Sequence, residues 1–151
     1  MKNIFISLIC FLAALPVVSQ NHFPWENPIM IARSADGKIF NPPAIFQDSS
    51  GVPCVIRWKS DTLIASFQWF RQPMGSPGWD RVAIKFSYDN GNTWTTPSPI
   101  VVNGLPANYQ RPFDPTVTVT ADKKIRIYYS SSNGMTPGGL DAIEYLFCHQ
   151  R

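Results

Sequence analysis

The sequence has 151 residues, of which 44% are hydrophobic, 13% aromatic and only 15% charged, with a formal net charge of +3. This balance argues against a disordered tail, a coiled coil and a collagen-like fibre, which need more charge, a heptad bias or far more glycine. The 14 proline residues disfavour long helices, because proline lacks a backbone N–H and clashes with the preceding helical turn. Composition therefore favours one small β-rich domain.

The first 19 residues have the organisation of a secretory signal peptide. Lys2 gives a positive start, residues 4–15 are uncharged and apolar, and Ser19 is a small residue at a plausible cleavage point. An uncleaved membrane anchor is the alternative, but the apolar run falls short of the roughly 20 residues that span a bilayer. We expect cleavage after Ser19 and export to the periplasm or the extracellular space, with no stable membrane span in the mature chain.

The mature chain shows no pattern that binds nucleic acid, a metal or a cofactor. Its lysine and arginine residues are scattered, without an extended basic cluster. His22 and His149 lie at opposite ends and no Cys-x-x-Cys pair accompanies them, so we expect no metal site. Cys54 and Cys148 remain after signal cleavage, and their spacing leaves open either a disulfide or a buried thiol at Cys54.

Residues 20–42 contain several prolines and the turn-forming pair Asp36-Gly37, and they predict an extended leader that lies along a sheet. Four short β-rich runs follow within residues 43–103, each bounded by turn-forming residues, which is typical of strands separated by turns. The expected strands cover residues 52–58, 62–70, 81–88 and 93–102. We therefore expect one complete four-stranded antiparallel unit.

After residue 110 the same order starts again. Residues 111–151 contain a predicted hairpin with strands at 115–120 and 125–131, followed by a third strand at 141–147. A fourth strand is missing, so we expect the second unit to be incomplete.

The most specific motif joins the third and fourth predicted strands and reads S-x-D-x-G-x-T-W from Ser87 to Trp94. The Asp89 carboxylate is placed to accept backbone N–H groups across the turn, and Gly91 supplies the left-handed residue that a hairpin tip needs. Ser87 and Thr93 are expected to face each other at the strand ends, with Trp94 packed beneath the turn. These five side chains are predicted to stabilise a hairpin rather than to carry chemistry.

This motif resembles the Asp-box (BNR) repeat of the neuraminidase-like sialidase superfamily, and the resemblance covers roughly residues 43–145. It implies an all-β fold, an incomplete sialidase-like β-propeller of about two four-stranded antiparallel blades at 43–103 and 111–151. In that family the Asp box lies on the rim away from the catalytic face. Two blades cannot close a ring, so we expect a fragment of a larger propeller, truncated in nature or in the gene model, with open sheet edges available for self-association.

The resemblance also implies a function, a secreted glycoside hydrolase of the exo-α-sialidase type whose partner is a carbohydrate or glycoconjugate. It implies no cofactor. With an incomplete site, the chain is expected to be inactive alone. The alternative is a non-catalytic secreted glycan-binding or adhesion module, because aromatic residues occur in loops without a recognisable acid/base pair.

Sialidases hold the substrate carboxylate with three arginines and use a tyrosine nucleophile assisted by glutamate, together with an aspartate acid/base. The usual Phe-Arg-Ile-Pro segment is absent, and residues 41–46 read N-P-P-A-I-F instead. Arg111 and Asp114 are the nearest catalytic candidates, since they precede the strand that would be innermost in the second blade. Alternatively, Asp114 caps a turn and Arg111 pairs with it. Hydrolysis needs a second group, for which Tyr109 and Glu144 are available.

Four aromatic residues in the first unit offer rings on which a sugar could stack, namely Trp58, Trp69, Phe70 and Trp79. Core packing explains Trp58 better, because it lies in an alternating strand. Trp79 lies in a loop rich in proline and glycine, where aromatic side chains are more often exposed. We therefore expect Trp79, together with Arg111, to contact the substrate.

Overall fold

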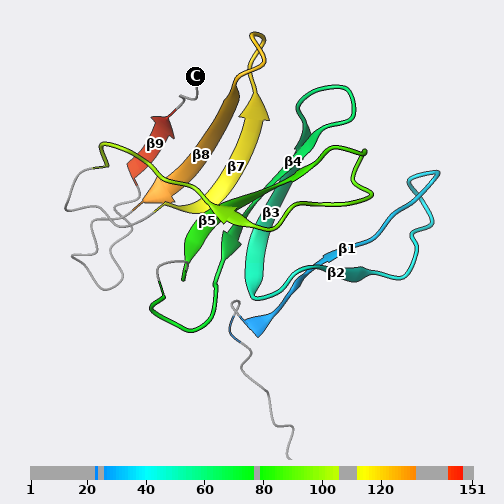
Figure 1. Ribbon diagram of the computed structural model, residues 1–151, viewed down its shortest axis with the longest axis horizontal. Helices are drawn as coiled ribbons and strands as arrows, with labels where there is room; N and C mark the ends of the chain where they lie inside the picture. The colour runs from blue at the N-terminus through cyan, green and yellow to red at the C-terminus, as the bar shows by residue number, and fades with distance from the viewer. Residues whose placement is uncertain (1–22, 24–25, 77–78, 106–111, 132–142, 148–151) are drawn as a thin grey trace, which may run out of the picture.

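The computed structural model describes residues 23, 26–76, 79–105, 112–131 and 143–147. These residues form nine β-strands and no helix (Figure 1), so the prediction of an all-β chain is confirmed. The strands are β1 (Ile29–Ile31), β2 (Ala44–Gln47), β3 (Ser50–Arg57), β4 (Leu63–Trp69), β5 (Arg81–Ser87), β6 (Ser98–Pro99), β7 (Phe113–Val119), β8 (Ile125–Ser131) and β9 (Ile143–Phe147).

The strands form three antiparallel sheets. β1 pairs with β2, the strands from β3 to β6 form a four-stranded sheet in chain order, and β7, β8 and β9 form the third sheet. The predicted strands at 52–58, 62–70 and 81–88 correspond to β3, β4 and β5. The predicted hairpin of the second unit is β7 and β8, and its third strand is β9. Short apolar and β-branched runs between turn residues were therefore sufficient to locate six strands.

The predicted strand over residues 93–102 is wrong in length, because β6 keeps only two residues. Pro97 and Pro99 lack the backbone N–H that a regular ladder needs. The segment nevertheless stays beside β5, since the N–H of Thr95 donates to the carbonyl oxygen of Phe86 at 2.8 Å.

The region predicted as an extended leader contains a strand that its sequence did not reveal. β1 forms a hairpin with β2, in which Ile31 lies opposite Ala44. The loop between them turns at Asp36, whose Oδ1 accepts the N–H of Lys38 at 2.8 Å and that of Ile39 at 3.0 Å. A strand of three residues is too short to show an alternating pattern, so its pairing emerges only in the folded chain.

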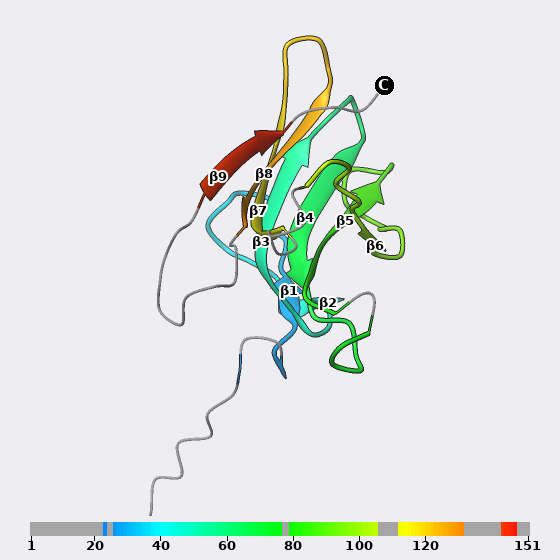
Figure 2. The ribbon, with the colours of Figure 1, turned by 90° about the vertical axis from the view of Figure 1, so that its left-hand side faces the viewer.

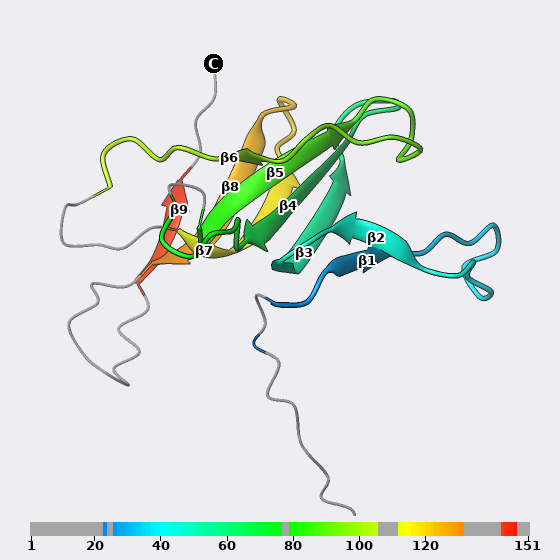
Figure 3. The same cartoon turned by 60° about the horizontal axis from the view of Figure 1, so that its bottom comes forward.

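The β1–β2 hairpin covers one face of the four-stranded sheet, and Figure 3 shows its loop extending past that sheet. Ile29 forms a buried cluster with Phe67 and Ala83. The Phe46 ring meets the Phe67 ring edge-on, with 6.1 Å between centroids. This cluster holds the hairpin against the middle of β4 and β5.

The third sheet packs on the other face of the four-stranded sheet, with β7 against β3 and β4 (Figures 1 and 2). The Cys54 Sγ lies 3.6 Å from the carbonyl oxygen of Val117, and the Trp58 indole N–H donates to the carbonyl oxygen of Lys123 at 2.7 Å. β3 and β7 therefore run in the same direction, and the β3–β4 and β7–β8 turns lie at the same end of the molecule. The Cys54 thiol is half-buried here, while Cys148 lies outside the described residues.

Candidate functional site

The segment from Ser87 to Trp94, here called the Asp-box turn, is closed by hydrogen bonds around one carboxylate. Asp89 accepts the Ser87 hydroxyl at 2.8 Å, the Thr93 hydroxyl at 2.6 Å and the Thr93 N–H at 2.8 Å. The Ser87 Oγ accepts the N–H of Gly91 at 2.7 Å. The two hydroxyls thus meet at the carboxylate, whereas the sequence predicted that they face each other directly.

Two residues at the tip of the Asp-box turn adopt left-handed backbone. Asn90 has a φ of 58° and Gly91 a φ of 87°. A Cβ at position 91 would also lie 3.2 Å from Cδ1 of Leu63, so this position has little room for a side chain. The Trp94 indole N–H donates to the carbonyl oxygen of Gly91 at 3.2 Å, which places the ring against the turn as expected.

The Asp-box turn is also tied to the turn between β3 and β4. The N–H of Asn90 donates to the carbonyl oxygen of Asp61 at 2.9 Å, and its side-chain amide donates to Oδ1 of Asp61 at 3.0 Å. Arg57 Nη1 donates to Oδ1 of Asn90 at 2.7 Å. These bonds connect the Asp-box turn to the turn between β3 and β4.

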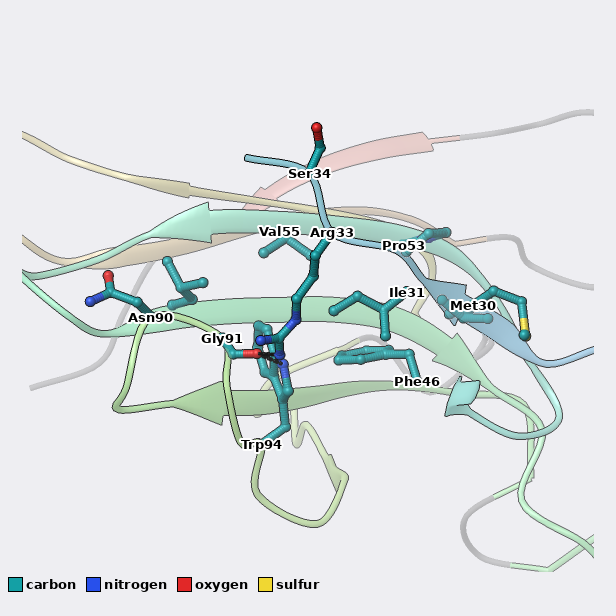
Figure 4. Close-up of a pocket in the computed structure, with 12 residues that line it drawn as sticks. Met30, Ile31, Arg33, Ser34, Phe46, Pro53, Val55, Asn90, Gly91 and Trp94 are labelled. Carbon is teal, nitrogen blue, oxygen red and sulfur yellow. Dashed lines mark hydrogen bonds between the residues drawn. The ribbon is translucent and has the colours of Figure 1, made fainter. Parts of the chain in front are cut away.

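Arg33 also holds the Asp-box turn in place, although no motif in the sequence indicated this contact. It follows β1, and its guanidinium donates to Oδ1 of Asn92 at 2.7 Å and to the carbonyl oxygen of Asn92 at 3.2 Å. It also donates to the carbonyl oxygen of Gly91, as Figure 4 shows. A single arginine after a short strand has no distinguishing pattern. Only the packing of the hairpin on the sheet brings Arg33 to the Asp-box turn.

Hydrogen bonding lowers the pKa of the Asp89 carboxyl from 3.8 to about 2. The Thr93 hydroxyl is the main cause and the Thr93 N–H the next, because both donate to the charged form. The pKa values of Asp36 and Asp122 are also lowered to about 2, chiefly by hydrogen bonds within their own turns. In these three turns, hydrogen bonds therefore favour the ionised form of an aspartate carboxyl.

We expect the protein to lose stability as the pH falls from about 4 towards 2. A carboxyl whose pKa is lower in the folded state than in the unfolded state stabilises the fold above the unfolded value, and this contribution is lost on protonation. Asp89→Asn removes one such carboxyl. The urea midpoint of this variant should therefore change less between pH 5 and pH 2.5 than that of the wild type. Equal changes would contradict the role of Asp89, and Asp122→Asn provides an independent repetition.

The candidate catalytic and substrate-binding residues lie at the other end of the sheets. Asp114 is the second residue of β7, exposed and with a φ of 53°. Trp79 lies just before β5, half-buried, with its ring 5.6 Å from the Phe70 ring. β7 runs in the same direction as β3, and the starts of β3 and β5 both lie beside the end of β4. The structure therefore brings Asp114 and Trp79 to one end, opposite the Asp-box turn.

The remaining catalytic candidates are only partly described. Arg111 and Tyr109 lie outside the described residues, and Glu144 is placed as the β9 partner of Ser130 in β8. The Asp114 carboxylate forms no hydrogen bond with a described residue, so nothing in that part of the chain shows it capping a turn. Asp114 is thus an exposed residue with left-handed backbone near the start of β7.

A hydrogen bond between a buried glutamine and a half-buried aspartate, which the sequence did not suggest, lies at the same end. The Gln68 amide donates to Oδ1 of Asp80 at 2.6 Å, and only 2% of Gln68 is exposed. Asp80 has a φ of 52°. A glutamine inside an otherwise apolar strand was the available signal, because burial of an amide requires a polar partner. The pair fixes the backbone directly after Trp79.

Trp58 and Trp69, the other two candidate tryptophans, each contact a neighbouring side chain. The Trp58 side chain is half-buried, and its ring centroid lies 6.2 Å from that of Phe86. The Trp69 ring is half-buried and carries the Arg71 guanidinium 5.5 Å from its centroid.

Two classes of site are not seen in the part of the chain that the structure describes. No group of three histidine, cysteine, aspartate or glutamate side chains there is arranged to hold a metal ion. No helix in the same residues is long and apolar enough to cross a membrane.

Comparison with known proteins adds no relative to this description. No family model matches the chain, and no curated protein or solved structure matches it either. The described residues form an all-β arrangement of three antiparallel sheets, with a hydrogen-bonded aspartate turn at one end, and Asp114 and Trp79 both lie towards the other end.

Proposed function

We propose that the two larger sheets are neighbouring blades of a secreted, sialidase-like β-propeller that binds carbohydrate or acts on it. The observation that carries this proposal is the Asp-box turn itself. Its S-x-D-x-G-x-T-W residues close around the Asp89 carboxylate between the third and fourth strands of an antiparallel sheet. This is the position that the Asp box has in a sialidase blade.

The packing of the two sheets supports the same proposal. β3 and β7, the first strands of their sheets, lie side by side and run in the same direction, with contacts between Cys54 and Val117 and between Trp58 and Lys123. Adjacent blades of a propeller repeat one sheet around a central axis, which gives equivalent strands this relation.

The candidate site also fits a carbohydrate. In the sialidase family that the sequence resembles, substrate binds on the face away from the Asp boxes. Asp114 and Trp79 lie at the end of the sheets opposite the Asp-box turn, which corresponds to that face. Trp79 offers an aromatic ring for stacking on a pyranose, and Asp114 offers a carboxylate for hydroxyl groups or for acid/base chemistry. Because hydrolysis requires a second catalytic group, binding without turnover is the second candidate function, favoured by the Phe70–Trp79 aromatic pair.

Trp79→Ala is expected to weaken glycan binding about tenfold, a loss of about 1.4 kcal/mol, because it removes the stacking surface. The measurement is a glycan array followed by titration with the best glycan. Tyr88→Ala is the matched control, since Tyr88 is an exposed aromatic residue at the Asp-box end and should leave the affinity unchanged. Equal affinity of Trp79→Ala and wild type would remove Trp79 from the site.

A fluorogenic sialoside separates the two candidate functions. We expect glycan binding with no turnover by this chain alone. Turnover that Asp114→Asn abolishes would instead assign hydrolysis to this chain. Absence of both binding and turnover would overturn the proposed function.

A further inference from the structure

We propose that a groove between the β1–β2 hairpin and β5 binds a small organic carboxylate with an apolar body, held between Arg33 and Lys85. The groove has a volume of about 490 Å³, and its lining includes Arg33, Asn41, Phe46, Lys85, Asn92 and Trp94. This volume is in the range of small-molecule sites. The lining contains two cationic side chains and no aspartate or glutamate.

Lys85 is the less expected of the two cations, because only 9% of it is exposed. Its ammonium group donates to the carbonyl oxygen of Phe46 at 2.9 Å and to Oε1 of Gln47 at 3.3 Å, and lies 4.6 Å from the centre of the Phe46 ring. All three partners are neutral. Burial lowers the pKa of Lys85, which reflects the cost of keeping this charge away from water. A bound carboxylate would offset that cost.

Arg33 is likewise held by neutral oxygens, those of the Asn92 side chain and of the Gly91 and Asn92 carbonyls. Neither Arg33 nor Lys85 forms an ion pair with a carboxylate of the described residues. A buried charged side chain normally has a counter-ion, because its desolvation is otherwise uncompensated. Lys85 is buried without a counter-ion among the described residues, and Arg33 is an exposed cation that lines the same groove, so the two side chains give the groove a positive potential.

The aromatic side chains that line the groove indicate that the ligand also has an apolar part. The Phe46 and Trp94 rings meet edge-on, with 5.0 Å between centroids, and line the groove together with the two cations. A second hollow of about 510 Å³ shares Arg33, Phe46 and Trp94 and adds apolar side chains such as Val55 (Figure 4). A carboxylate attached to a ring would satisfy both the charge and these apolar walls. This inference is independent of the proposed function, whose residues Trp79 and Asp114 lie at the opposite end of the sheets.

The test is titration of the purified full chain with benzoate and with benzamide, which has nearly the same shape but no charge. Tryptophan fluorescence and the indole N–H resonance of Trp94 report binding. We expect saturable binding of benzoate and affinity for benzamide weaker by about tenfold or more. Equal affinity for the two compounds, or no saturation by benzoate, would overturn the proposal.

Two variants locate the site. Lys85→Met and Arg33→Gln should each weaken benzoate binding by about tenfold or more, because each removes one charge that contacts the anion. Lys38→Met is the matched control, since Lys38 is an exposed cation on the same hairpin that lines neither hollow. Circular dichroism verifies that each variant is folded. If Lys85→Met fails to fold, the benzoate affinity of Arg33→Gln alone tests whether the groove is the binding site. Wild-type affinity in both folded variants would contradict the site.

Discussion

Phe67→Ala is expected to lower the free energy of unfolding by about 3–5 kcal/mol, measured by urea denaturation. The Phe67 side chain is fully buried and packs with Ile29 and Ala83, while its ring meets the Phe46 ring edge-on. Truncation therefore removes the apolar contacts of Phe67 with the hairpin and with its own sheet, and it leaves a cavity between them. The hairpin should also detach more often, so cleavage by trypsin after Lys38 should become faster.

The control for this prediction is Val55→Ala on the neighbouring strand. Val55 is 52% exposed, so its truncation should cost less than about 1 kcal/mol and leave trypsin cleavage unchanged. A loss below about 1.5 kcal/mol for Phe67→Ala would mean that the hairpin is not held by this cluster.

Gly91→Ala is expected to cost about 2–3 kcal/mol, since two separate penalties act at this position. The φ of 87° disfavours any residue with a Cβ, and that Cβ would lie 3.2 Å from Cδ1 of Leu63. Movement of Leu63 would disturb the start of β4, directly beside the Asp-box turn. The change in unfolding free energy, again from urea denaturation, gives the total of both penalties.

Gly104→Ala separates these two penalties. Gly104 has a similar φ of 79°, but no atom of the described residues lies within 4 Å of the position of its Cβ. Its substitution should therefore cost only the backbone term of about 1–2 kcal/mol. If both variants lose the same stability, the contact with Leu63 contributes nothing and the packing part of the prediction is wrong.

The Asp-box turn shows which features can be predicted from residues that lie close together in the sequence. Asp89 bonds to Ser87 and Thr93, residues only two and four positions away, so spacing alone predicted a carboxylate-centred turn. The same reasoning failed in detail at β6, where two prolines interrupt the ladder although the flanking residues favour a strand. Local propensity therefore predicts where the chain turns, while backbone donors decide how much of a strand forms.

The candidate ligand end was predictable only in part. The loop rich in proline and glycine indicated Trp79, whereas Asp114 was indicated only by the resemblance to sialidase-like propellers, in which it would precede the innermost strand of the second blade. That they share one end of the sheets depends on β3 and β7 running in the same direction, a property of the packing between two sheets. The buried Gln68–Asp80 bond joins β4 to the residue that precedes β5, and it too forms only when these strands are paired.

By itself, the sequence determined the all-β class, most strand positions and the location of a turn centred on Asp89, because those depend on residues within a few positions of one another. Only the tertiary structure decided that a three-residue strand starts a hairpin, that this hairpin covers the sheet, and that Arg33 reaches Asn92 across 59 positions of the chain. It also placed Lys85 beneath the hairpin with neutral partners. Such contacts result from burial of apolar faces brought together by folding, and no local pattern of residues encodes them.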